Sequence, residues 1–188
     1  MERWVRFFTD TMGFNLLVHF DDKAISTEDS ALMSKVVQDA TGKIKLPINE
    51  PASGKRKSQI EEYLEYNYSP GIQHVALATD NIIKTVTLLR EAGVEFLSVP
   101  KTYYEDLDKQ VGKIDESIDE LAELGILVDR EKEGYLLQIF TQPVEDRPTL
   151  FFEVIERHKA QRFGEGNFKS LFVAIEREQA LRGNLVRI

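Results

Sequence analysis

The spacing of apolar residues predicts a helix followed by three strands in the first part of the chain. Trp4, Phe8 and Met12 repeat at helical spacing, and Gly13 is placed to end that helix. Apolar stretches bounded by polar residues then predict strands at 14–20, 30–37 and 43–49. A loop rich in Pro, Gly, Lys and Ser at 50–58 and a short helix at 59–67 complete this part.

The remainder of the chain has a similar order of elements but opens with a strand. The stretch IQHVALAT, residues 72–79, is typical of a buried strand, and a helix is predicted over 81–93. An acidic helical insertion is expected over 103–125. A Gly-rich turn at 163–168 leads into a C-terminal helix over 168–182. Further strands are predicted at 94–99, 125–130, 134–141 and 149–157.

Both parts contain a helix, a glycine and then strands, which points to a duplicated strand–helix–strand–strand–strand unit. On this interpretation the fold is α+β. Residues 1–70 form an incomplete first module with a linker, and residues 71–188 form a second module with its C-terminal helix. The first module lacks its opening strand, which would lie before Met1. Internal similarity this faint is equally compatible with chance.

The composition excludes several classes of function. The 188 residues carry a net charge of −8 without a basic stripe, which argues against a nucleic-acid partner. The absence of cysteine excludes disulfides, thiolate nucleophiles and sulfur-ligated metal sites. No apolar run approaches the ~18 residues of a membrane span, and the N-terminus has no secretory apolar core. We therefore expect no membrane association and a cytoplasmic location.

Two residues stand out as candidate metal ligands. His74 lies within the predicted strand 72–79, and Glu153 lies in TLFFEVIER among phenylalanine, valine and isoleucine. An unpaired buried carboxylate costs several kcal/mol, so Glu153 requires a cation or a strong donor. One histidine and one carboxylate make two thirds of the facial triad that holds Fe(II) in oxygenases. The alternatives are a histidine satisfied within the core and a glutamate that points to solvent.

Other residues are weaker candidates. His19 and His158 have charged neighbours in the sequence and are expected to be exposed. No dinucleotide-binding, phosphate-loop or nucleophile-elbow motif is present. Neutral amides near strands or turns suit an anionic or phenolic ligand, although each singly is more typical of a solvent-facing residue. These amides belong to Asn49, Gln59, Gln73, Gln138 and Asn167.

Several longer stretches resemble the 4-hydroxyphenylpyruvate dioxygenase family over essentially the entire chain. They include PINEP, KRKSQIEEYLEYN, GIQHVAL, GYLLQIFTQPVEDRPTLFFEVIER and FGEGNFKSLFVAIEREQALRGNL. The resemblance covers the C-terminal, catalytic half of that enzyme and implies a half-open barrel of βαβββ modules of the vicinal-oxygen-chelate type. It implies an Fe(II) enzyme that converts 4-hydroxyphenylpyruvate and O₂ to homogentisate and CO₂ in tyrosine catabolism, and a homo-oligomer when full-length.

The resemblance also implies roles for individual residues. His74 and Glu153 match metal ligands of the family, and a helix over the site carries Asn167 at its entry. Gln138, Asn167 and Phe168 are implied in catalysis. The residues implied in substrate binding are Ser30, Asn49, Gln59, Gln73, Gln138, Phe140, Phe152, Phe163 and Phe168.

The chain departs from the family pattern at one ligand. The family's first histidine ligand lies on the strand that would precede Met1, and neither His19 nor His158 matches a ligand position. We therefore expect an N-terminally truncated catalytic half. The alternatives are 4-hydroxymandelate synthase, which shares the metal and substrate, and an inactive fragment or non-catalytic ligand-binding module.

Overall fold

The protein has an α+β fold, as the sequence predicts, and its strands form two β-sheets that are not closed into a barrel. The computed structural model describes residues 1–20, 31–52, 55–160 and 165–183. The chain divides into two compact units, one comprising Met1–Leu64 with Glu176–Ile188 and the other Glu65–Ile175. This grouping assigns the end of the C-terminal helix to the first unit, whereas the predicted division after residue 70 left it in the second. In the described part of the chain no helix is both long and apolar enough to span a membrane.

The first unit is built on a three-stranded antiparallel sheet. Helix α1 (Glu2–Arg6) continues into a π-helical turn (Phe7–Thr11), so the predicted N-terminal helix is confirmed. The sheet has the order β1-β2-β3. Its strands are β1 (Asn15–Phe20), β2 (Ala31–Gln38) and β3 (Lys45–Ala52), and helix α2 (Gln59–Asn67) follows. Strand β3 continues through Ala52, so the loop predicted from residue 50 begins later.

The second unit is built on a four-stranded sheet of order β4-β7-β6-β5, in which β4 runs parallel to β7 and the other neighbours are antiparallel. Its strands are β4 (His74–Ala78), β5 (Leu127–Arg130), β6 (Tyr135–Phe140) and β7 (Phe151–His158). Its helices are α3 (Ile82–Glu91), α4 (Leu107–Val111), α5 (Ile118–Leu124) and the first part of α6 (Glu165–Leu181), with a 3₁₀ turn at Lys101–Tyr103.

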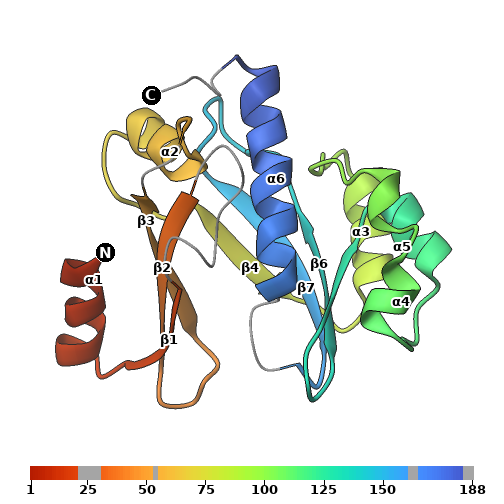
Figure 1. Cartoon of the computed structure of the whole chain (residues 1–188), viewed down its shortest axis with the longest axis horizontal. Helices are drawn as coiled ribbons and strands as arrows, with labels where there is room; N and C mark the ends of the chain where they lie inside the picture. The colour runs from red at the N-terminus through yellow and green to blue at the C-terminus, as the bar shows by residue number, and fades with distance from the viewer. Residues whose placement is uncertain (21–30, 53–54, 161–164, 184–188) are drawn as a thin grey trace. The chain divides into compact units, whose positions relative to one another are not determined.

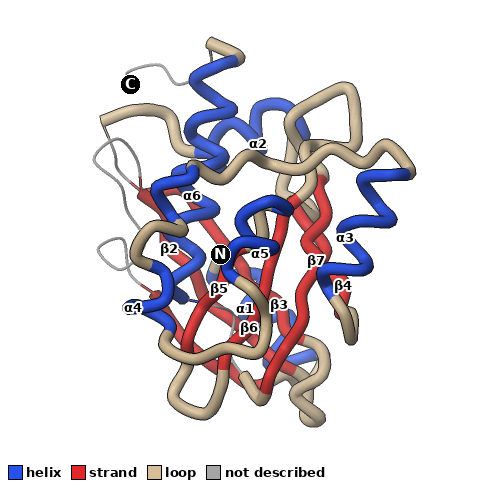
Figure 2. The backbone as a smooth tube through the Cα atoms, turned by 90° about the vertical axis from the view of Figure 1, so that its right-hand side faces the viewer, coloured by secondary structure: helices blue, strands red, loops and turns tan. Residues whose placement is uncertain are grey.

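The two faces of this sheet pack against different helices. Leu137, Ile139 and Val154 point to one face and join residues of α3, α4 and α5 in the larger apolar core. Each fully buried side chain of this size stabilises the fold by about 1.5–3 kcal/mol. The opposite face carries Phe140 and Phe151, which pack with Leu171 of α6. Figure 1 shows α3, α4 and α5 grouped on one side of β6 and β7, and Figure 2 views the unit from that side.

Three sequence predictions in this unit are wrong. Residues 94–99 do not form a strand but only a single bridge, Phe96 to Thr141. Phe96 and Leu97 enter different apolar clusters, as neighbouring residues of an extended segment do, and Leu97 N donates to Phe140 O at 2.8 Å, so the segment lies beside the end of β6 without forming a regular strand. Strand β4 is not buried but lies at the sheet edge, with Val75 and Leu77 exposed.

The third error concerns the turn before the C-terminal helix. Helix α6 already begins at Glu165, so the predicted turn at 163–168 is too long and Asn167 lies inside the first helical turn. The acidic insertion is helical as predicted, but it is divided into short pieces by non-helical residues.

We predict that Gly134→Ala destabilises the protein strongly. A Cβ at this position would lie 1.9 Å from the carbonyl oxygen of His158, and backbone cannot move aside as a side chain can. We expect a loss of roughly 3 kcal/mol, the upper range for overpacking, measured by urea unfolding followed by circular dichroism. Gly125→Ala is the control. It has a left-handed φ of +74° but no close contact, and should cost only about 1 kcal/mol. Equal losses would contradict the steric argument.

Candidate functional site

The pairing of β4 with β7 brings His74 and Glu153 together. In the parallel register His74 lies opposite Phe151 and Ala76 lies opposite Glu153. Because side chains alternate along a strand, residues 151 and 153 share one face, and His74 is a diagonal neighbour of Glu153 on that face. The distance from His74 Nε2 to Glu153 Oε2 is 3.6 Å. Two residues far apart in sequence thus converge at one point of the sheet.

The surroundings shift both groups toward their neutral forms. Burial lowers the pKa of His74 to about 4. Burial also raises the pKa of Glu153 to about 7, against the lowering effects of the Gln138 amide and of the Arg157 charge. Near neutral pH the imidazole is therefore unprotonated, which is the form that binds metal ions. The buried carboxylate lacks a full counter-charge, and a cation would provide it.

The donor set fits a divalent metal ion. Protein nitrogen and oxygen ligands lie ~2.1 Å from ions such as zinc, so a single ion can bridge two atoms 3.6 Å apart. Imidazole with carboxylate suits iron, zinc or manganese. Within the described ranges of this unit, His74 is the histidine that the structure brings to Glu153.

Two buried amides continue from the carboxylate. Gln138 Nε2 donates to Glu153 Oε1 at 2.6 Å, and Asn167 Nδ2 donates to Gln138 Oε1 at 2.8 Å. The side chains of Gln138 and Asn167 are 4% and 2% exposed. The solvent-facing alternative is therefore wrong for both residues. The amides connect α6 to the carboxylate through β6.

Aromatic rings flank the histidine on the same face. The rings of His74 and Phe151 stack with centroids 4.9 Å apart, and Phe140 approaches His74 edge-on at 6.5 Å. Phe140, which the resemblance implies in substrate binding, thus lies beside His74, and Phe151, which the sequence analysis did not name, lies there too. Strand alternation points Phe152 to the opposite face with Val154, so the structure does not bring it to the site. Phe163 and the side chain of Phe168 lie outside the described residues.

The remaining predicted amides have different settings. Gln73 directly precedes β4, and its carbonyl oxygen accepts from Phe151 N at 3.0 Å. Gln59, in the first unit, begins α2 and is buried. Asn49 pairs across β2–β3 with Ser34. Asn49 Oδ1 and Ser34 Oγ are buried with no hydrogen-bond partner within the described part of the chain.

Ser34 was missed by the sequence analysis, which named Ser30, a residue outside the described ranges. The signal was present, because a serine within the alternating pattern of SALMSKVV shares a face with Leu32 and Val36. Unsatisfied buried polar atoms each cost about 1–3 kcal/mol. The Ser34–Asn49 pair is therefore a second place where a polar ligand would be stabilised.

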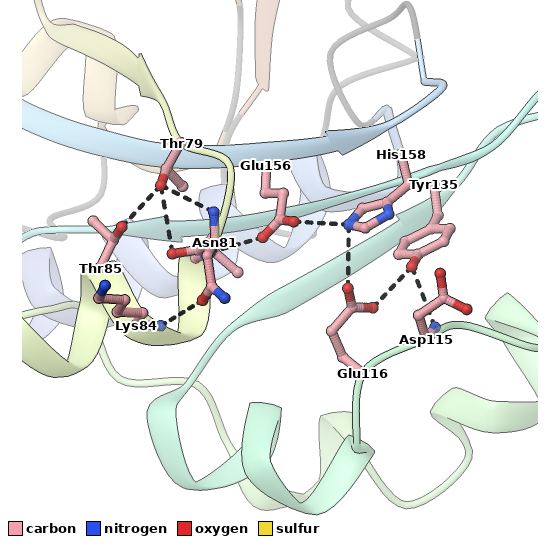
Figure 3. A network of polar contacts seen from close by, with 10 residues as sticks. Thr79, Asn81, Lys84, Thr85, Asp115, Glu116, Tyr135, Glu156 and His158 are labelled. Carbon is pink, nitrogen blue, oxygen red and sulfur yellow. Dashed lines mark hydrogen bonds and ion pairs between the residues drawn. The ribbon is translucent and has the colours of Figure 1, made fainter.

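The other two histidines differ from each other. His19 is exposed, as predicted. The same prediction is wrong for His158, whose Nε2 lies 2.9 Å from Glu156 Oε1 and 3.1 Å from Glu116 Oε1 (Figure 3). The His158 ring also stacks on Tyr135 at 4.4 Å. Tertiary contacts bring these groups together, although each has polar sequence neighbours.

One ligand atom from each of Glu116, Glu156 and His158 lies within 4.8 Å of the others, which is close enough to hold a metal ion. Both carboxylates already have donors, however. Glu156 Oε2 accepts from Ile82 N at the start of α3, and Glu116 Oε2 accepts from Tyr135 Oη (Figure 3). The cluster, which we call the His158 clasp, is accordingly a hydrogen-bonded group that joins α3, β6 and β7.

Comparisons with known proteins give a consistent set of relatives. Residues 1–139 match the model of the Glyoxalase/Bleomycin resistance protein/Dioxygenase superfamily. Proteins named 4-hydroxyphenylpyruvate dioxygenase are 52% identical in Yarrowia lipolytica, over 98% of this chain and 48% of that protein, and 53% identical in Sus scrofa, over the same shares. The chain thus spans about half the length of the curated relatives it matches.

A solved structure shows the same architecture. A triple mutant of 4-hydroxymandelate synthase from Streptomyces coelicolor superposes with a TM-score of 0.86 and 34% identity. The match covers 95% of this chain and 50% of that one.

We predict that metal binding at His74 and Glu153 releases protons, and that the number released per metal ion depends on pH. With a carboxyl pKa of about 7 and an imidazole pKa of about 4, Glu153 is the group that must lose a proton at pH 6. Uptake of Co²⁺ should release roughly nine-tenths of a proton at pH 6 and about one-tenth at pH 8. Titration calorimetry in buffers of different ionisation enthalpy measures this number. In the Glu153→Gln variant, proton release on Co²⁺ uptake should no longer differ between pH 6 and pH 8. If the difference persists in this variant, Glu153 is not the source of the proton.

Proposed function

This chain belongs to the Glyoxalase/Bleomycin resistance protein/Dioxygenase superfamily, and we propose that it carries the catalytic centre of a 4-hydroxyphenylpyruvate dioxygenase. The reaction converts 4-hydroxyphenylpyruvate and O₂ to homogentisate and CO₂, a step of tyrosine catabolism. The observation that carries the proposal is the His74–Glu153 pair, 3.6 Å apart on a sheet face lined by Phe140 and buried amides. Identities of 50–53% to proteins with that name support it.

In this proposal His74 and Glu153 hold Fe(II). Bound there, the iron would polarise the substrate's 2-oxo acid and activate O₂. The neutral imidazole leaves the charge of the site to the carboxylate, and Gln138 fixes that carboxylate through its hydrogen bond to Oε1. Positioning of this kind supports metal affinity without adding charge.

The substrate's ring and polar groups have matching partners in the second unit. Phe140 and Phe151 provide apolar surface and ring edges beside His74. Gln138 and Asn167 provide neutral hydrogen-bonding groups that suit a phenol or an oxo acid without competing for the metal. We propose Ser34 and Asn49 as additional ligand-binding residues because of their unsatisfied buried oxygens.

Roles for Gln59, Gln73, Phe152, Phe163, Phe168 and Ser30 rest on the family resemblance alone. A cytoplasmic location and homo-oligomer formation likewise stay predictions.

A second candidate function is that of 4-hydroxymandelate synthase, which uses the same substrate and oxidises its benzylic carbon. The structural similarity to such an enzyme, with a TM-score of 0.86, favours this candidate. Its identity of 34% is lower than the 52–53% found for dioxygenases. We therefore place the dioxygenase first.

We predict that Glu153→Gln weakens Fe(II) binding at least about tenfold, because a ligand loses its charge. The matched control is Glu156→Gln, a substitution on the same strand that alters the His158 clasp instead. Fe(II) affinity, measured anaerobically by titration, should stay unchanged in this control. The reverse order of effects would move the metal to the cluster of Glu116, Glu156 and His158.

We predict homogentisate as the product when the chain is supplied with Fe(II), 4-hydroxyphenylpyruvate and O₂. Homogentisate and 4-hydroxymandelate are isomers, so proton NMR of the isolated product must separate them. Homogentisate has three ring protons and a methylene group, and 4-hydroxymandelate has four ring protons and a carbinol proton. Detection of the carbinol proton would select the second candidate. Iron binding without either product would leave a ligand-binding module.

A further inference from the structure

We infer that Tyr103 is a positioning residue for Glu153, acting through Asn167 and Gln138. The inference rests on the proposed function, in which Glu153 is a metal ligand. Tyr103 lies in the 3₁₀ turn before α4, within the acidic insertion, and no candidate role was assigned to it from the sequence. In the described part of the chain its hydroxyl bonds to Val128 and Asn167 and not to His74 or Glu153, so any effect on the site must pass through other side chains.

The contacts run in an unbroken series from Tyr103 to the carboxylate. Tyr103 Oη lies 3.3 Å from Asn167 Oδ1, Asn167 Nδ2 lies 2.8 Å from Gln138 Oε1, and Gln138 Nε2 lies 2.6 Å from Glu153 Oε1. The three polar residues after Tyr103 are each at most 5% exposed. Buried polar side chains with few alternatives to their present partners transmit a change of orientation along such a network.

The direction of donation follows from the carboxylate at the end. As a metal ligand the Glu153 carboxylate is ionised and only accepts, so Gln138 then turns its NH₂ group toward Glu153 and its oxygen toward Asn167. Asn167 must then donate, which leaves its Oδ1 facing Tyr103. A donor at that last position stabilises this orientation, and burial raises the pKa of Tyr103 to about 12, so its hydroxyl keeps a proton that can point toward Asn167 Oδ1. The Tyr103 hydroxyl thus selects the amide orientation that serves Glu153.

Tyr103 also contacts the backbone of strand β5, which gives it a second, structural role. Its hydroxyl donates to Val128 O at 2.9 Å and accepts from Val128 N at 3.0 Å. Strand β5 is an edge strand, so this hydroxyl satisfies backbone groups that would otherwise be unpaired. If Tyr103 had only a structural role, its hydroxyl would affect Val128 and leave the amides of Asn167 and Gln138 unchanged. The single hydroxyl proton is shared between the strand and Asn167, which joins the edge of the sheet to α6.

The adjacent tyrosine is a matched control. Tyr104 is buried, and its hydroxyl donates to Ile126 O at 3.0 Å, two residues before Val128. Tyr104→Phe therefore removes one buried hydroxyl from the same turn and the same neighbourhood of β5. The Tyr104 hydroxyl donates to the backbone at Ile126, whereas the Tyr103 hydroxyl also reaches Asn167 Oδ1.

The first experiment uses NMR spectra of the whole metal-free chain labelled with ¹⁵N. The side-chain NH₂ signals of Gln138 and Asn167 are identified by their loss in Gln138→Glu and Asn167→Asp. Tyr103→Phe should shift the Gln138 side-chain signal and speed the exchange of its protons with solvent, and Tyr104→Phe should do neither. If Tyr103→Phe alters the Val128 backbone amide but leaves the Gln138 signal in place, Tyr103 is a strand brace and the inference is overturned.

The second experiment uses Co²⁺ alone as a probe of the metal centre. Loss of a direct outer-shell partner typically costs 10–100-fold in metal affinity. For Tyr103→Phe, two hydrogen bonds further away, we expect about three- to tenfold weaker binding and a changed visible absorption spectrum of the bound ion. Tyr104→Phe should leave both unchanged. Equal effects of the two variants would overturn the inference.

The results that would contradict the proposed function differ from those that would contradict the role of Tyr103. If the wild-type chain does not bind Co²⁺, or Glu153→Gln binds it equally well, the metal centre is overturned, and the Gln138 NMR signal still decides the role of Tyr103. If Tyr103→Phe does not fold, the chain can instead be labelled with 3-fluorotyrosine, which retains the hydroxyl of every tyrosine. The fluorine signal of Tyr103 should then shift in Asn167→Ala while that of Tyr104 stays fixed, and an unmoved Tyr103 signal would count against the inference.

Discussion

The parallel pairing of β4 with β7 is the constraint on which the candidate site depends. It places His74 opposite Phe151 and thereby puts the imidazole within 3.6 Å of the Glu153 carboxylate. A slip of one residue would turn His74 to the opposite face, because side chains alternate along each strand. The antiparallel pairing of β6 with β7 then sets Phe140 opposite Glu153 and Gln138 opposite Ile155. Two registers therefore define the composition of the site.

The two faces of this sheet differ in composition, which explains how the Glu153 carboxylate can be buried on one of them. The face toward α3, α4 and α5 is filled by aliphatic side chains and supplies the main core. The other face combines phenylalanines with Gln138 and Asn167, so Glu153 has hydrogen-bonding partners in an otherwise apolar setting. Burial without a full counter-charge raises its pKa to about 7. A site of this kind favours a bound cation over an empty, ionised state.

Two glutamates on β7 show how strand position decides chemistry. Glu153 lies on the face with the phenylalanines, and three residues later Glu156 lies on the opposite face, where it binds the start of α3 and His158. The first carboxylate has an amide and a neutral imidazole as neighbours and can accept a metal ion. The second has its oxygens occupied by a backbone N–H and an imidazole. The same side chain therefore serves as a candidate ligand in one setting and as a structural clasp in the other.

The sequence by itself determined the α+β class, most of the strands and helices, and the candidates His74, Glu153, Gln138 and Asn167. Those features depend on local periodicity and on residue types that are costly to bury, and both can be read from neighbouring positions. The resemblance carried by the longer stretches added Phe140 and the proposed reaction. Only the tertiary structure decided that Phe151 and not Phe152 faces His74, that residues 94–99 form a single bridge to the end of β6, and that His158 lies between two glutamates. It also revealed Tyr103 and Ser34, because their roles depend on strand register and on partners distant in the chain, which local patterns do not encode.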